Sequence, residues 1–220
     1  MTTEDGRGVV FDLDGVLIDS EPLHLRAFQD VLAGYGVSLG ADVYFTTYLV
    51  LPDRDVLGRL LPDPDRLDEA LAAKQRRYLE LVATGVPAFA DGLALLAGIR
   101  GWRVGLATGS LRDEAELALR ALGVRDRFQA IVAIEDCRRG KPDPEPYRLA
   151  AAALGLSPDR CVAVEDAPGG VRAAKRAGMR CVAVTHTCAR ERLAEADAIV
   201  DDLGAVDLEA VLRGEGSGGV

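Results

Sequence analysis

Short apolar, β-branched runs alternate with helical patterns along most of the chain. Strands are expected at Val9–Asp14, Arg103–Thr108, Ala130–Ile134, Cys161–Asp166, Cys181–Thr185 and Ala198–Val200. Helical patterns separate most of these runs, for example Arg112–Leu122 and Pro144–Leu154, and a glycine follows each of those two in the helix-stop position. This alternation predicts a mostly parallel α/β sheet, doubly wound with helices on both faces.

One long segment interrupts the alternation. Residues 17–86 contain no convincing strand, and their apolar positions follow a helical period, as Leu25, Phe28 and Leu32 do. The stretch TGVPAFADG then returns the chain to the α/β pattern. The sequence therefore predicts a helical domain over 17–86, inserted after the first strand, and a core domain made of 1–16 and 87–220.

Composition and charge narrow the classes of function. The chain has 220 residues and a net charge of −9, which argues against a nucleic-acid partner because such proteins present a basic face. No apolar run approaches the ~18 residues of a membrane span, and the polar N-terminus does not resemble a signal peptide. The four cysteines form no C-x-x-C pair and are expected to be reduced. We expect a cytoplasmic protein, with a monomer as the default.

Acidic pairs end two of the predicted strands. Asp12 and Asp14 follow the first strand in VVFDLDG, and Glu165 and Asp166 end CVAVED. A strand-end turn explains Asp14 but not Asp12, and a helix N-cap is an alternative for Asp166. Because parallel strands end at the same edge of a sheet, four carboxylates meet there and need a cation. Oxygen ligands without nearby histidine or cysteine favour Mg²⁺ over zinc.

Two other strand ends carry groups that suit phosphate. Thr108, Gly109 and Ser110 follow VGLA, and Ser110 with Asp113 fits a capping box of the next helix, whose free N–H groups attract anions. Lys141 lies in GKPDPE, after the third strand. We expect Lys141 to offset the carboxylates and hold a phosphoryl group. A plain capped helix and a solvated loop lysine are the alternatives.

Three polar side chains of the helical segment are ambiguous. His24 shares a helix face with apolar residues, and Lys74 falls on the apolar stripe of a later helix. Packing explains both, and so does a position in a cleft between the domains. Arg54 lies in a turn, where a surface position is an equal alternative. In the core, His186 has no partner that the sequence indicates, and we interpret it as structural.

The motifs DLDGV, TGS, GKPDPE and VEDAPGG resemble, in order, the four motifs of the haloacid dehalogenase-like phosphotransferase superfamily. The helical insertion resembles the C1 cap of that family, and the subgroup looks like the β-phosphoglucomutase and phosphoglycolate-phosphatase-like branch. The resemblance covers nearly the whole chain. It implies a Rossmann-like α/β core with an α-helical cap inserted after the first strand.

The resemblance also implies roles for the residues at the strand ends. Asp12 would be the nucleophile that becomes an aspartyl-phosphate, and Asp14 would be the general acid and base. Thr108, Gly109 and Lys141 would hold the phosphoryl oxygens. A carboxylate nucleophile splits the reaction into two steps, and each step needs the charge on the phosphoryl group to be neutralised.

A Mg²⁺ site follows from the same resemblance. Its ligands would be Asp12, the main-chain carbonyl of Asp14, Asp166 and Glu165. The ion would screen the repulsion between the anionic nucleophile and the anionic substrate. The metal and the lysine together would then make the closeness of the carboxylates tolerable.

The leading hypothesis is a Mg²⁺-dependent phosphatase acting on a small phosphorylated metabolite such as a sugar phosphate. The cap would select the substrate, with His24, Arg54 and Lys74 as candidate contacts. The alternative is a sugar-phosphate mutase like β-phosphoglucomutase. Two departures weigh against it, because GSLRDE lacks the asparagine that mutases use there, and a cap glycine is replaced within YLVLPDRD.

Two other classes are weaker alternatives. A phospho-switch of the response-regulator kind also uses strand-end aspartates, a hydroxyl group and a lysine, but the helical insertion and Asp14 argue against it. A catalytically silent binding protein of the same fold is the second. The intact motifs give no support for a loss of activity.

Overall fold

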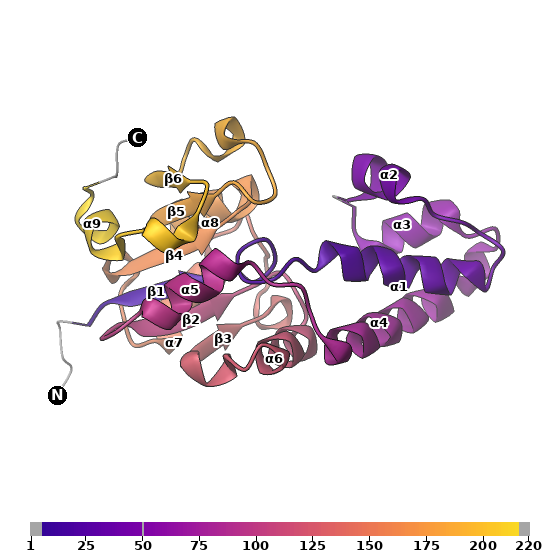
Figure 1. Cartoon of the computed structure of the whole chain (residues 1–220), viewed down its shortest axis with the longest axis horizontal. Coiled ribbons are helices and arrows are strands. Elements are labelled where there is room, and N and C mark those ends of the chain that lie inside the picture. Colours follow the sequence, from indigo (N-terminus) through magenta and orange to yellow (C-terminus); the bar gives the residue numbers. More distant parts are fainter. Residues whose placement is uncertain (1–5, 50, 216–220) are drawn as a thin grey trace. The chain divides into compact units, whose positions relative to one another are not determined.

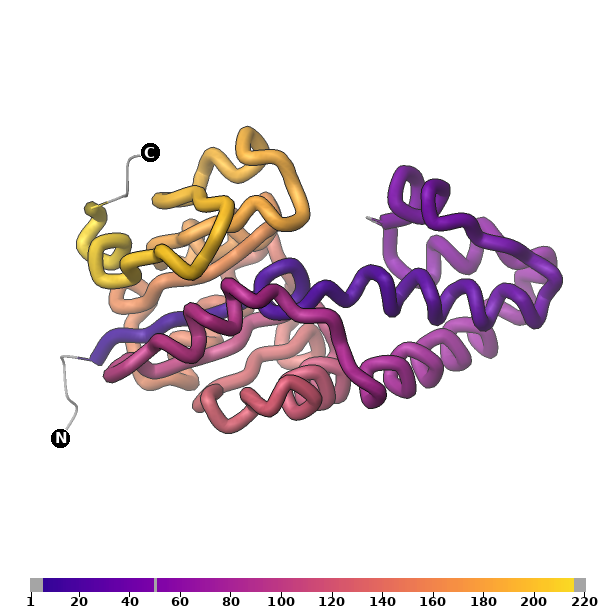
Figure 2. Tube along the Cα trace, viewed as in Figure 1, coloured from indigo at the N-terminus to yellow at the C-terminus, as the bar shows by residue number. Residues whose placement is uncertain are grey.

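The computed structural model describes residues 6–49 and 51–215. These residues fall into two compact units, a core unit with the residues up to Asp19 and from Pro87 onward, and a helical unit, Ser20–Val86. Figure 1 labels the helices and strands. The colours of the Cα trace in Figure 2 follow the sequence, so the helical unit can be found there by its residue numbers. The first border falls at Ser20 rather than at residue 17, because residues 17–19 still hydrogen-bond within the core unit.

The core unit contains one parallel sheet. Its strands, six within the described ranges, are β1 (Gly8–Phe11), β2 (Arg103–Ala107), β3 (Ala130–Val132), β4 (Cys161–Glu165), β5 (Arg180–Val184) and β6 (Ala198–Val200). Their spatial order is β3-β2-β1-β4-β5-β6, and every neighbouring pair is parallel. Val10 of β1 lies opposite Gly105 on one side and Ala163 on the other. The chain that follows β1 therefore emerges in the middle of the sheet edge.

Helices flank this sheet. They are α5 (Ala90–Gly98), α6 (Arg112–Ala121), α7 (Glu145–Ala153), α8 (Pro168–Ala177) and α9 (Leu208–Arg213). Residues of α7 and α8 share a buried cluster with Val10 and Ala163, whereas the neighbouring Val9 and Phe11 point to the opposite face because side chains alternate along a strand. Burial on both faces explains why the strands are continuous apolar runs. The predicted parallel α/β architecture is confirmed.

The helical unit has a core of its own. Its main helices are α1 (Glu21–Ala33), α2 (Ala41–Val43), α3 (Asp53–Leu60) and α4 (Leu67–Thr84). α1 packs along α4, and the buried cluster includes Leu25, Phe28 and Leu32, whose spacing predicted a helix. Across residues 6–49 and 51–215, no helix has both the length and the apolar character that a membrane crossing requires.

The first strand is shorter than the sequence indicated. β1 ends at Phe11, so Asp12 and Asp14 lie in the turn that follows it. The N–H of Gly15 donates to the carbonyl of Ile18 at 2.8 Å, and this local bond closes the turn. The two aspartates are therefore positioned by turn geometry as well as by the strand before them.

The chain leaves and re-enters the core unit along one short pairing. Ile18 and Ala88 form an antiparallel bridge, and the N–H of Asp19 donates to the carbonyl of Pro87 at 2.9 Å. Backbone groups on both connecting segments are satisfied in this way. The turn after β1 is thus held by the segment that precedes α5.

Gly92 of α5 packs tightly against that turn. A Cβ atom at Gly92 would lie 2.1 Å from the carbonyl oxygen of Val16, whereas Gly98 of the same helix has nothing within 4 Å. We expect Gly92→Ala to destabilise the protein by about 1–3 kcal/mol, because the backbone at Val16 or the helix would have to move to make room for the methyl group. Gly98→Ala should stabilise it by about 0.5–1 kcal/mol because alanine restricts the unfolded chain. Urea unfolding measures both, and equal effects of the two substitutions would contradict this packing.

Candidate active site

The core unit brings the predicted polar residues to the carboxyl edge of the sheet. Asp12 follows β1, Thr108 follows β2, and Glu165 ends β4. Lys141 lies in the loop before α7. Because β1 lies between β2 and β4, the ends of these three strands meet at one place. This is where ligands bind in open parallel α/β sheets.

Lys141 connects two carboxylates at this edge. Its Nζ lies 2.9 Å from Oδ1 of Asp12 and 2.7 Å from Oε1 of Glu165. The side chain of Lys141 is 14% exposed, so its charge is largely removed from water. Burial opposes that charge, but Asp12 and Glu165 outweigh it and raise the pKa of Lys141 above its usual range. Two carboxylates therefore favour the charged form of Lys141 in this site.

Glu165 is fully buried, and four donors hold it. Oε1 accepts from Lys141 and from the hydroxyl of Tyr147 at 2.6 Å, and Oε2 accepts from the N–H groups of Asp166 at 3.1 Å and Ala167 at 3.4 Å. Each oxygen thus accepts two hydrogen bonds. Sequence reasoning missed Tyr147, although it follows Lys141 closely on the same loop and helix.

The space that Glu165 occupies depends on a glycine of α8. A Cβ atom at Gly170 would lie 1.7 Å from Oε1 of Glu165. Any other residue would therefore displace the carboxylate or the helix. This contact explains the second of the two glycines after Pro168 in VEDAPGG on packing grounds.

Asp12, Glu165 and Asp166 form a compact acidic cluster. Each offers an oxygen, and these atoms lie within 4.8 Å of one another. Burial raises the pKa of Asp12 well above its usual range despite the opposing effect of Lys141. Burial and then the charge of Glu165 raise the pKa of Asp166 to about 7. Three carboxylates carry more negative charge than one lysine can offset. A set of oxygen donors of this kind fits a hard divalent cation.

The loop after β1 meets the loop after β2 through a serine. The hydroxyl of Ser110 donates to Oδ2 of Asp14 at 2.5 Å, and the N–H of Ser110 donates to Oγ1 of the buried Thr108 at 3.0 Å. The expected capping box at Ser110 is wrong, because α6 is capped at Leu111, whose N–H donates to Glu114 at 2.9 Å. The Ser110 side chain orients Asp14 instead.

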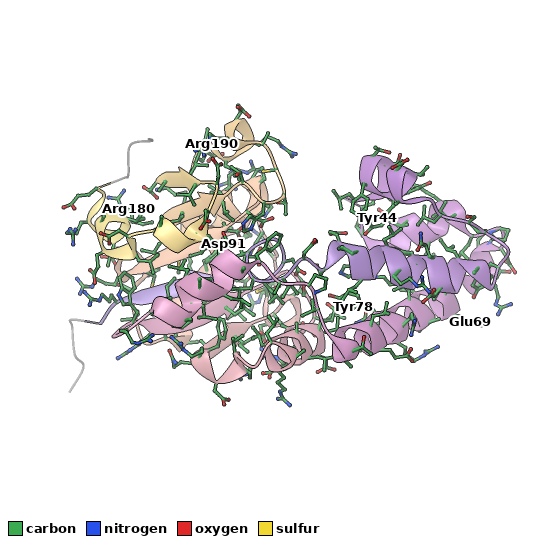
Figure 3. All side chains as sticks on the ribbon, viewed as in Figure 1. Tyr44, Glu69, Tyr78, Asp91, Arg180 and Arg190 are labelled. Carbon is green, nitrogen blue, oxygen red and sulfur yellow. The ribbon has the colours of Figure 1, made fainter. Side chains whose placement is uncertain are left out.

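Within the helical unit, the side chains of His24, Lys74 and Asp53 lie together in one polar group. Nζ of Lys74, which is fully buried, lies 2.5 Å from Oδ2 of Asp53 and 2.6 Å from Nδ1 of His24. The ring of His24 stacks on Tyr78, which projects from α4 in Figure 3, with centroids 4.0 Å apart. Two residues that the sequence left ambiguous are therefore partners of each other.

Arg54 is not part of this group. Its guanidinium is half exposed and pairs with Asp68, with distances of 2.7 and 2.9 Å to Oδ1. The pair is on the surface of the helical unit, where such pairs add little stability. A substrate contact for Arg54 stays a prediction, as it does for His24 and Lys74.

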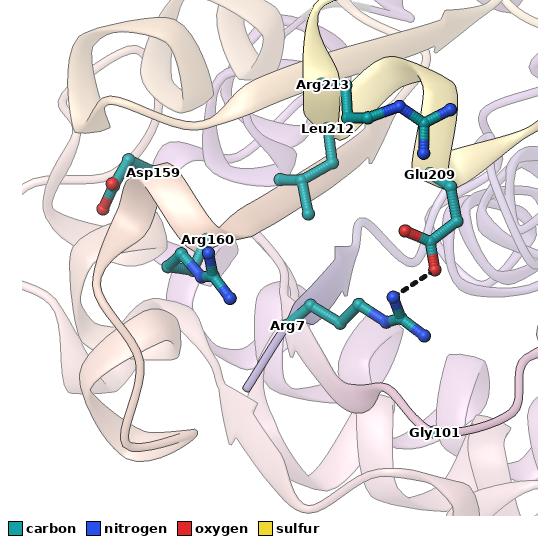
Figure 4. A pocket seen from close by; sticks show the side chains of 7 residues that line it. All are labelled: Arg7, Gly101, Asp159, Arg160, Glu209, Leu212 and Arg213. Carbon is teal, nitrogen blue, oxygen red and sulfur yellow. Dashed lines mark ion pairs between the residues drawn. The ribbon is translucent and has the colours of Figure 1, made fainter. Parts of the chain in front are cut away.

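A pocket of about 630 Å³ lies at the opposite edge of the sheet, where strands begin (Figure 4). It is lined by Arg7, Gly101, Asp159, Arg160, Glu209, Leu212 and Arg213. Arg7 pairs with Glu209 at 2.5 Å, and Arg213 pairs with Glu215 at 2.9 Å. The arginines of this pocket are therefore paired with nearby carboxylates. At the carboxyl edge, by contrast, the carboxylates outnumber the one lysine.

Comparison with known proteins places the chain in a family. Residues 7–178 match the model of the haloacid dehalogenase-like hydrolases, and this match spans more than half of the chain. The chain therefore belongs to the haloacid dehalogenase-like hydrolase family. The expectation drawn from its four motifs is confirmed.

Several relatives are named as phosphatases of phosphorylated sugars and related compounds. The chain is 36% identical over 202 residues to a validoxylamine A 7'-phosphate phosphatase of Streptomyces hygroscopicus subsp. limoneus, covering 90% of this chain and 94% of that protein. It is 32% identical over 181 residues to the fructose-1-phosphate phosphatase YqaB of Escherichia coli, covering 80% and 95%. These relatives confirm the expected class, a phosphomonoester phosphatase.

A solved structure agrees with the same assignment. CbbY from Rhodobacter sphaeroides in complex with phosphate superposes with a TM-score of 0.80 at 30% identity, covering 94% of this chain and 99% of that one. A β-phosphoglucomutase from Clostridium difficile superposes with a TM-score of 0.75 at 23% identity, covering 95% and 96%, and shows the shared fold. These structures agree with the fold that the sequence predicts.

His24 provides a test of the helical unit's interior. Burial and then the ammonium group of Lys74 lower the pKa of His24 to about 3. The unfolded chain takes up a proton as the pH falls through about 6.5, but the folded chain does not, so this group lowers stability in acid and has no effect above that pH. The chain has only two histidines, which makes each ring signal assignable.

We expect the ring Cε1–H signal of His24, assigned with His24→Gln in untagged protein, to stay at its neutral position between about pH 5 and pH 8. Proton NMR across that range measures it. The His186 signal in the same sample is the internal comparison. A midpoint for His24 near its ordinary value would contradict the buried contact with Lys74.

Proposed function

We propose that the protein is a Mg²⁺-dependent phosphatase that hydrolyses a small phosphorylated metabolite through an aspartyl-phosphate. The observation that carries the proposal is the arrangement of Asp12 and Lys141 beside Glu165 and Asp166 at the carboxyl edge of the sheet. It joins a carboxylate nucleophile, a fixed cation and oxygen ligands for a metal within one site. Asp14 lies two residues from the nucleophile and supplies a second carboxylate.

Asp12 is the proposed nucleophile. Its Oδ1 accepts from the N–H of Leu13 at 2.8 Å and lies 2.9 Å from Nζ of Lys141. With this oxygen anchored, Oδ2 is the atom assigned to attack phosphorus. Lys141 and the hydroxyl of Thr108 would stabilise the phosphoryl oxygens, with the backbone at Gly109 close by. Fixed donors of this kind favour the charge distribution of the transition state.

Asp14 is the proposed general acid and base. It would protonate the leaving oxygen of the substrate in the first step and take a proton from water in the second. The hydroxyl of Ser110 donates to its Oδ2 and fixes the direction of the side chain. Such a division of labour explains why two carboxylates follow one strand.

The residues present fit a Mg²⁺ ion. Asp12, Asp166 and the main-chain carbonyl of Asp14 would hold it, and when bound it would neutralise charge on the nucleophile and the phosphoryl group. Glu165 belongs to the same acidic cluster, and its oxygens already accept four hydrogen bonds. We therefore assign Glu165 mainly to holding Lys141.

The proposed substrate class is a phosphorylated sugar or polyol. The named relatives act on validoxylamine A 7'-phosphate and on fructose 1-phosphate, and both names describe phosphate esters of polyhydroxylated carbon skeletons. His24, Arg54 and Lys74 of the helical unit are proposed to help select among such esters. A cytoplasmic location is part of the proposal, supported by the four free cysteines, and a monomer is its default oligomeric state.

Replacement of the nucleophile is the direct test. Asp12→Asn should abolish release of phosphate from a panel of sugar and polyol phosphates, lowering kcat by at least ~10³-fold, because an amide cannot form the acyl phosphate. Asp159→Asn, a change near the opposite edge of the sheet, should leave the rate within about twofold of wild type. Malachite-green assays measure both. Equal rates for wild type and Asp12→Asn would sink the assignment.

Two further measurements test the metal requirement and the mutase alternative. Phosphate release should stop in EDTA and return on addition of Mg²⁺, because three buried carboxylates cannot stay ionised beside a phosphate dianion without it.

Phosphorus NMR with β-glucose 1-phosphate and a bisphosphate primer should show free phosphate as the product. Conversion to glucose 6-phosphate without release would establish the mutase instead.

A further inference from the structure

His186 connects three segments of the core unit. Its Nδ1 lies 2.9 Å from the carbonyl oxygen of Gly15, and its Nε2 lies 3.0 Å from Oδ2 of Asp91 at the start of α5. Its ring stacks on Phe89, with centroids 4.0 Å apart and planes 9° apart. The side chain is only 12% exposed. Figure 3 labels Asp91 on α5 in the core unit.

Gly15 is the residue next to the proposed general acid. Its φ of +77° is left-handed, and a Cβ atom there would lie 2.0 Å from Oδ2 of Asp166, so only glycine fits. Its N–H donates to the carbonyl of Ile18 at 2.8 Å, and its own carbonyl faces His186. Because each peptide unit is planar, these two bonds fix the peptide planes on both sides of Gly15 and thereby the carbonyl of Asp14.

Both ring nitrogens of His186 face hydrogen-bond acceptors. The Gly15 carbonyl can only accept, and Oδ2 of Asp91 already accepts from the N–H of Leu203 at 2.8 Å. Although Asp91 is partly buried, this backbone bond and the charge of His186 lower its pKa and keep it ionised. Nδ1 therefore donates to the Gly15 carbonyl, and Nε2 lies against the Asp91 carboxylate, so the ring is held on both sides.

We propose that His186 is a positioning residue for Asp14, holding the turn at Gly15 from behind while Asp91 and Phe89 hold its ring. The inference rests on the proposed function, because it assigns His186 an effect on the acid–base steps. His186 does not touch the reacting atoms. It acts by fixing the main chain at Gly15, and through it the positions of the Asp14 carboxyl and carbonyl groups.

The chemistry defines what a displaced Asp14 would change. In the first step Oδ2 of Asp12 forms a bond to phosphorus, the phosphorus–oxygen bond to the substrate breaks, and the leaving oxygen takes the proton of Asp14. In the second step Asp14 takes a proton from water, the water oxygen bonds to phosphorus, and the bond to Asp12 breaks. A leaving group that is stable as an anion needs no proton in the first step.

The kinetic test uses two aryl phosphates. In His186→Leu, kcat/KM for phenyl phosphate should fall about tenfold or more, whereas kcat/KM for p-nitrophenyl phosphate should fall much less, because nitrophenolate leaves without general acid help. A burst of nitrophenolate should precede a slower steady state, since the second step still needs Asp14. An unchanged ratio of the two kcat/KM values, relative to wild type, would overturn the positioning role.

Two further variants separate positioning from packing. His186→Asn keeps a donor at the position of Nδ1 and should recover most of the phenyl phosphate rate. Phe89→Leu removes the stacked ring but keeps both polar contacts, so it should lower thermal stability without changing the ratio of the two substrates. The same change of ratio in Phe89→Leu as in His186→Leu would overturn the proposal in favour of a general packing effect.

Hydrogen exchange makes the test independent of activity. The amide of Gly15 should exchange about tenfold faster in His186→Leu than in wild type, and His186→Asn should restore its protection. Unchanged exchange at Gly15 would overturn the inference even in an active enzyme. A wild type that is inactive on both aryl phosphates and on sugar phosphates would overturn the proposed function, while the exchange data would still decide whether His186 holds the turn.

Discussion

One ammonium group held between two buried carboxylates is the interaction on which the candidate site depends. Lys141 lies within 3 Å of Asp12 and of Glu165, at an edge of the sheet where water is largely excluded. Carboxylates this close repel one another, and burial strengthens the repulsion. The surrounding contacts all reduce it. Tyr147 and two main-chain N–H groups donate to Glu165, and Thr187 donates to Asp166.

The topology of the sheet makes this arrangement possible. β1 has parallel neighbours on both sides, so the residue after it is reached from the end of β2 and from the end of β4. A strand at the border of the sheet would offer neighbours on one side alone. The central position of β1 therefore explains how the ends of β2 and β4, with Thr108 and Glu165, come to the same edge as Asp12 although they are far from it in sequence.

Much of this could be predicted from the sequence, for physical reasons that differ between residues. Strands buried on both faces are continuous apolar runs, so their order along the chain was readable, and unpaired acids at their ends stood out because burial makes them costly. His186, Tyr147 and Thr187 could not be found in this way. Their partners lie far away in sequence, and a histidine, tyrosine or threonine near an apolar run is ordinary.

Ser110 and Lys74 show a second kind of limit. The pattern at Ser110 fits a helix cap, but its hydroxyl bonds to Asp14 across the sheet edge, and the N-cap residue of the helix is Leu111 instead. Lys74 falls on an apolar stripe, yet it is fully buried because Asp53 and His24 satisfy it. In both cases a local rule gave way to a tertiary partner, which a single sequence does not reveal.

The antiparallel pairing of residues 18–19 with 87–88 has a consequence for how such chains diversify. The segment by which the chain leaves the core unit pairs with the segment by which it returns. The inserted residues therefore form a long loop whose two ends are already held together within the core unit. Its length and content can change through recombination without moving β1 or β2, since closing a longer loop costs only slowly more entropy. The proposed catalytic edge can therefore stay unchanged while the inserted segment varies in size and content.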